Sequence, residues 1–105
     1  MQLNIIIDNH SMNLDVPDDF IAASDESFDR LDKTMSKGVK LGGRFVKDPN
    51  PVQRCQYAAN KLLVAIESHH EPMAMLSAGY IIARQPTVKG VKIDNNGEPE
   101  ETTFL

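Results

Sequence analysis

Basic residues surround a pair of glycines in the middle of the chain. Residues 37–54 contain Gly42-Gly43 and five cations: Lys37, Lys40, Arg44, Lys47 and Arg54. A helix that begins at the end of this segment presents free backbone N–H groups, which favour a bound anion. We therefore treat Lys40, Arg44, Lys47 and Arg54 as a candidate site for a phosphate or a carboxylate. The alternative is a solvated loop whose bases offset a neighbouring acidic helix, because no glycine motif for phosphate binding is present.

A second candidate is the segment Glu67-Ser68-His69-His70-Glu71. Glu67 and His70 have the Glu-x-x-His spacing, which places two metal ligands on one helix face. A di-iron carboxylate site needs two such pairs and further glutamates, and this chain has a single pair. His10 is the only other histidine. We therefore interpret His69 and His70 as part of a polar helix end, and we expect neither a metal nor another cofactor.

Cys55 is the only cysteine of the chain. Its place near the start of a predicted helix, beside Arg54, would favour a reactive thiolate. Its place on an apolar stripe favours a buried and inert thiol instead. No serine has the G-x-S-x-G context of a nucleophile. Since no catalytic residues emerge, we expect a protein without catalysis.

Residues 73–82 are apolar around the whole circumference of a predicted helix. Its proposed contact face carries Met73, Leu76, Tyr80 and Ile81. Adaptable methionines, an aromatic ring and small residues are typical of a surface that packs against a second subunit or a protein partner. The alternative is a central core helix, which is also apolar on every side.

The surrounding elements follow from periodicity and from capping residues. Alternating apolar residues predict strands at residues 2–8 and 12–16, which form a hairpin. Helices are predicted at about 18–37 with a break at Ser24-Asp25, at 51–69 and at 72–84. Asn50, Pro51 and Gln53 are typical of a capped helix start. A second hairpin joins predicted strands at 87–94 and 102–105, and residues 38–50 are the least regular stretch.

This order predicts an α+β fold in a single domain over residues 1–105. We expect an N-terminal β-hairpin, three central helices and a C-terminal β-hairpin, with the helices packed on one antiparallel sheet. The chain has 105 residues, of which 41% are hydrophobic and 25% charged. These values are close to ordinary globular usage and suffice for one core.

Charge is distributed in blocks along the chain. Residues 1–32 carry eight acids and one base, and residues 33–61 carry seven bases and one acid. A helix explains part of this change from acidic to basic residues. Acidic side chains are favourable near the N-terminus of a helix, and lysines are favourable near its C-terminus. The net charge of −4 argues against nonspecific binding to nucleic acid or to a membrane. Without a signal-peptide pattern, a membrane span or a pair of cysteines, we expect a cytoplasmic protein.

Two hypotheses about function follow. The first is a small non-catalytic cytoplasmic protein that forms a homodimer, or docks on a protein partner, through its third helix. The alternative is a binding or regulatory domain for a small anion, which would use the basic segment at residues 37–54.

Overall fold

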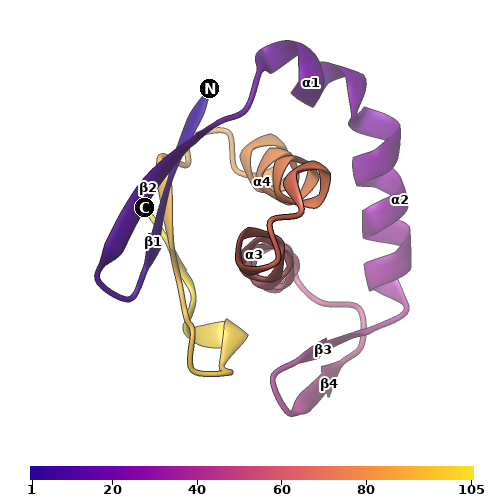
Figure 1. Ribbon diagram of the computed structural model, residues 1–105. Coiled ribbons are helices and arrows are strands. Elements are labelled where there is room, and N and C mark those ends of the chain that lie inside the picture. The colour runs from indigo at the N-terminus through magenta and orange to yellow at the C-terminus, as the bar shows by residue number, and fades with distance from the viewer.

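The structure is a computed structural model that describes all of residues 1–105 (Figure 1). It contains, in chain order, β1 (Gln2–Ile7), β2 (His10–Asp15), α1 (Asp18–Ala23), α2 (Asp25–Ser36), β3 (Val39–Leu41), β4 (Arg44–Val46), α3 (Pro51–Glu67), α4 (Glu71–Arg84), β5 (Gly90–Ile93), the 3-10 helix η1 (Pro99–Glu101) and β6 (Thr103–Phe104). The predicted α+β class is confirmed. No helix combines the length and the apolar character needed to cross a bilayer.

The main sheet has the strand order β2-β1-β5-β6. The two predicted hairpins are present as β1–β2 and β5–β6, and they join in one sheet through β1 and β5. These two central strands run parallel, so the sheet is mixed and differs from the antiparallel sheet that we expected. Four helices separate the two hairpins. A connection of this length can bring the chain back so that β5 runs in the same direction as β1.

The elements form three layers (Figure 1). The hairpin of α3 and α4 lies in the middle, with the sheet on one side and α1 and α2 on the other. The core fills both spaces, from Leu3 and Ile5 on β1 to Phe28 and Met35 on α2. The chain itself covers α4 from two sides. This packing explains why α4 is apolar around its circumference without a second subunit.

Helix α1 and helix α2 reach α4 through two aromatic rings. Gly79 allows this approach, since a Cβ atom there would lie 3.1 Å from Cζ of Phe28 and 3.3 Å from Cε2 of Phe20. The ring of Phe28 meets the ring of Tyr80 edge to face, with centroids 6.0 Å apart. Large aromatic side chains therefore attach α1 and α2 to α4.

Local signals set the boundaries of the helices. The side chain of Asn50 accepts from the N–H of Gln53, whose side chain accepts in turn from the N–H of Asn50, so the predicted capping box is confirmed. The break near Ser24 is also confirmed, although its hydroxyl donates to the carbonyl of Phe20 instead of capping α2. The irregular segment 38–50 contains a small hairpin, β3–β4, which turns at Gly42 with φ +65°.

Candidate functional site

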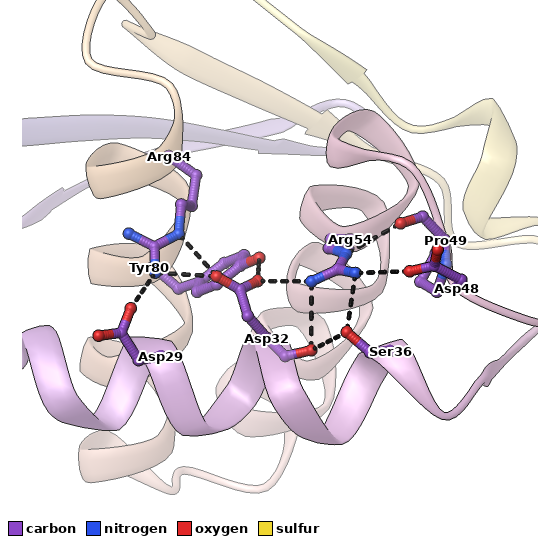
Figure 2. A network of polar contacts seen from close by, with 8 residues as sticks. All are labelled: Asp29, Asp32, Ser36, Asp48, Pro49, Arg54, Tyr80 and Arg84. Carbon is purple, nitrogen blue, oxygen red and sulfur yellow. Dashed lines mark hydrogen bonds and ion pairs between the residues drawn. The ribbon is translucent and has the colours of Figure 1, made fainter.

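Asp32 on α2 is the centre of a polar network that binds three helices together (Figure 2). The phenol of Tyr80 on α4 donates to Oδ1 of Asp32 at 2.5 Å, and Nε of Arg84 donates to Oδ2 at 3.0 Å. From the other side, Nη1 of Arg54 on α3 donates to Oδ1 at 3.2 Å. The many acids at residues 18–32 are typical of a charged face exposed to solvent, and Asp32 departs from that expectation because its carboxylate lies between α3 and α4.

Arg54 extends the network into the loop before α3. Its guanidinium also donates to the carbonyl oxygens of Pro49 and Asp32, to the hydroxyl of Ser36 and to the carboxylate of Asp48. Its side chain keeps only 17% of its surface exposed. A planar guanidinium with several donors suits this role better than an ammonium group. Arg54 therefore fastens the end of α2 and the loop at Asp48 to the start of α3.

The network changes the ionisation of its members. Burial alone would raise the pKa of the Asp32 carboxyl, but hydrogen bonds from Tyr80, Arg84 and Arg54 outweigh it and hold the pKa below its usual value. Burial and the bond to Asp32 raise the pKa of the Tyr80 phenol. Asp32 therefore stays charged and Tyr80 stays neutral at neutral pH, which is the state that their hydrogen bond requires.

The four cations of the predicted anion site do not converge. Arg54 lies against Asp32 and Asp48, and Arg44 donates to both carboxylate oxygens of Glu100 on η1 at 2.7 Å. Lys40 and Lys47 are exposed and make no ion pair. The two arginines are thus already neutralised by carboxylates of their own chain.

An apolar groove lies between α2 and the hairpin of α3 and α4. Its volume is about 280 Å³, and eight of its twelve lining residues are hydrophobic. The walls are Leu31, Thr34 and Met35 from α2, Gly38 and Val39 from the following loop and β3, Tyr57, Ala58 and Lys61 from α3, and Met73, Leu76, Ser77 and Tyr80 from α4.

Three of the four residues predicted for an interface line this groove. Met73 and Leu76 are half-buried on its wall, whereas Tyr80, which also lines the groove, is only 1% exposed. Ile81 is completely buried in the core and lies outside the groove. Tyr80 and Ile81 therefore cannot be surface contacts of the kind that we expected, because α1, α2 and the sheet cover α4.

Lys61 is the one lysine or arginine on the groove wall, and no carboxylate lies there. Its ammonium nitrogen lies 5.3 Å from the centre of the Tyr57 ring, within the range of a cation–π contact. No carboxylate forms an ion pair with it. The groove thus combines an apolar interior with one unpaired positive charge.

The histidine and cysteine candidates lie elsewhere. Nδ1 of His70 accepts from the N–H of Met73 at 3.2 Å and caps α4, while Glu67, His69 and His10 are exposed. No group of three or more histidine, cysteine or acidic residues is placed to hold a metal ion.

Cys55 is 1% exposed, and burial raises the pKa of its thiol. This favours the inert alternative of the two that the sequence left open.

Sequence reasoning missed Asp32 and the groove. A signal for Asp32 was present, because it lies one turn from Phe28 and close to Met35, on the face that packs inward. The groove has no local signal, since it is formed by helices distant in sequence. Comparison with protein-family models, with curated proteins and with solved structures gave no match.

Proposed function

We propose that this protein is a non-catalytic binding module, which takes an apolar anchor of a protein partner into the groove between α2, α3 and α4. The single observation that carries the proposal is the groove itself. Two of the residues expected to contact a partner, Met73 and Leu76, lie half-buried on its wall.

The size of the groove supports anchor side chains over a large ligand. Pockets for drug-sized molecules have volumes of about 300–1,000 Å³, and this groove, at about 280 Å³, is at the lower end of that range. Protein partners commonly bind through a few aromatic or aliphatic side chains that enter such pockets. The methionines Met35 and Met73 can adjust their shape to different anchors.

The charge of the groove specifies the partner further. Lys61 is unpaired at the wall, so an acidic group beside the apolar anchor would find a complementary charge there. Such a charge adds mainly to specificity and to the rate of association. The partner that fits is therefore an apolar segment flanked by aspartate, glutamate or a terminal carboxylate.

The alternative function is the binding of a small anion by residues 37–54. The contacts of the basic side chains do not favour it. Arg44 and Arg54 would have to exchange carboxylates of their own chain for the ligand. Lys40 and Lys47 remain as two separate exposed charges. We therefore place the site in the groove.

The test uses anilinonaphthalene sulfonate, a fluorescent probe that joins an apolar body to an anionic group. We expect saturable fluorescence enhancement, which Leu76→Glu abolishes by placing a negative charge on the groove wall. Val64→Glu is the matched control, because Val64 lies on α3 outside the groove and is 48% exposed. Thr34→Trp, at the exposed rim, should block the groove without burying a charge. Equal binding by all four proteins would refute the proposal, and near-ultraviolet circular dichroism checks that each is folded.

A further inference from the structure

Strand β2 is an open edge of the main sheet. It is the outermost strand, it has six residues, and five of these are exposed. The opposite edge, β6, has only two residues. Natural proteins protect long edges with proline, lysine, a bulge or a covering element. The sequence His-Ser-Met-Asn-Leu-Asp has neither proline nor lysine, and its register with β1 is continuous.

The register decides which backbone groups of β2 are free. The N–H of Asn4 donates to the carbonyl of Lys89, so even-numbered residues of β1 face β5. Odd-numbered residues of β1 therefore bond to β2, where their partners are the even-numbered residues Leu14, Met12 and His10. Ser11, Asn13 and Asp15 then direct their N–H and C=O groups away from the sheet.

We infer that β2 pairs with β2 of a second copy of this chain, in an antiparallel arrangement with two-fold symmetry. One register uses every free group of the edge. It places Asn13 opposite Asn13 of the second copy, and Ser11 opposite the second copy's Asp15, at both ends of the contact. The two four-stranded sheets then become one continuous sheet.

The same register matches the side chains on both faces. On the helix-facing side, Met12 lies opposite the second copy's Leu14, and both are apolar side chains that the helices leave partly uncovered. On the outer side, each Asp15 faces a serine hydroxyl. The two Asp15 residues are offset by four residues, roughly 13 Å, which exceeds the screening length of about 10 Å at 0.1 M salt. The edge is therefore complementary to itself.

This surface is independent of the groove, because β2 contributes nothing to the groove wall. The proposed contact involves one six-residue strand from each copy, whereas stable interfaces bury at least roughly 1,200 Å². We therefore expect a dimer that dissociates on dilution. Sedimentation equilibrium over a roughly hundredfold range of concentration measures its dissociation constant.

Charge substitutions at Ser11 test the register. Ser11→Lys creates two attractive pairs with Asp15 across the two-fold axis, and we expect it to lower the dissociation constant by about two- to thirtyfold. Ser11→Asp creates two repulsive pairs and should raise it by a similar factor. Asn13→Pro removes a free N–H at the centre of the edge without touching the β1–β2 ladder. It should leave a folded monomer, and Asn13→Ala, which keeps the N–H, should still dimerise.

Three results would overturn the inference. The first is a wild-type protein that is monomeric at every concentration. The second is a shift of the dissociation constant in the same direction by Ser11→Lys and by Ser11→Asp. The third concerns the groove. A dimer that survives Asn13→Pro but is lost on Leu76→Glu would show that copies meet at the groove and not at β2.

Discussion

The phenol of Tyr80 donates a hydrogen bond to the carboxylate of Asp32, with 2.5 Å between the oxygens. The two residues are 48 positions apart and join α4 to α2. Tyr80 also lines the apolar groove. One side chain therefore both holds α2 in place and shapes the site that α2 encloses.

Tyr80→Phe should lower the free energy of unfolding by about 1.5–3 kcal/mol, the usual range for a hydrogen bond to a charged group. The aromatic ring at this position of the groove lining remains. We therefore expect urea denaturation to show the loss of stability while the groove still binds its probe. An unchanged unfolding free energy would mean that the bond contributes nothing.

Asp32→Asn should remove part of the pH dependence of stability. Because the pKa of Asp32 is lowered in the folded protein, its stabilising contribution is fully present above the ordinary value of 3.8 and is lost as pH falls through the lowered value. The variant should be less stable by about 1–3 kcal/mol at neutral pH. This difference should shrink in urea titrations as pH falls from about 5 towards about 2.

Asp29→Asn is the matched control for that experiment. Asp29 also pairs with Arg84, at 3.2 Å, but its side chain is 72% exposed. An exposed ion pair contributes about 0–1 kcal/mol. If Asp29→Asn destabilised the protein as much as Asp32→Asn, the central role of Asp32 would be disproved.

Gly38→Ala should destabilise the junction between α2 and β3 by about 1–3 kcal/mol. Gly38 has φ +123°, where residues with a Cβ atom are strained, and the ring of Phe45 lies directly over it. Gly43→Ala is the control, since a Cβ atom there meets nothing within 4 Å. Thermal unfolding should separate the two variants, and equal midpoints would contradict the strain argument.

The parts of the fold that could be predicted from the sequence depend on neighbouring residues. Asn50, Pro51 and Gln53 predicted the start of α3, because capping is completed within one turn. The parallel pairing of β1 with β5 joins Ile5 to Val91 and has no local signature. Strand direction there depends on the path of the whole chain.

The candidate site was less predictable for a related reason. An apolar helix such as α4 has the same sequence whether its own chain or another subunit covers it. Arg54 likewise has the same neighbours in sequence whether it binds an external anion or Asp32. Only the position of α2 distinguishes these alternatives. That position depends on contacts between residues far apart in the sequence, such as the ring contact between Phe28 and Tyr80.

The most direct measurement of groove binding is a titration of methyl-labelled methionine signals in NMR spectra. The chain has five methionines, of which Met35 and Met73 line the groove, whereas Met1 and Met12 are exposed outside it. The probe is N-acetylphenylalanine, an apolar anchor with a carboxylate, and its uncharged amide is the control. We predict saturable shifts of Met35 and Met73, unchanged Met1 and Met12, and weaker binding of the amide because it lacks the attraction to Lys61. Unmoved groove signals, or equal shifts at all the methionines, would contradict the account.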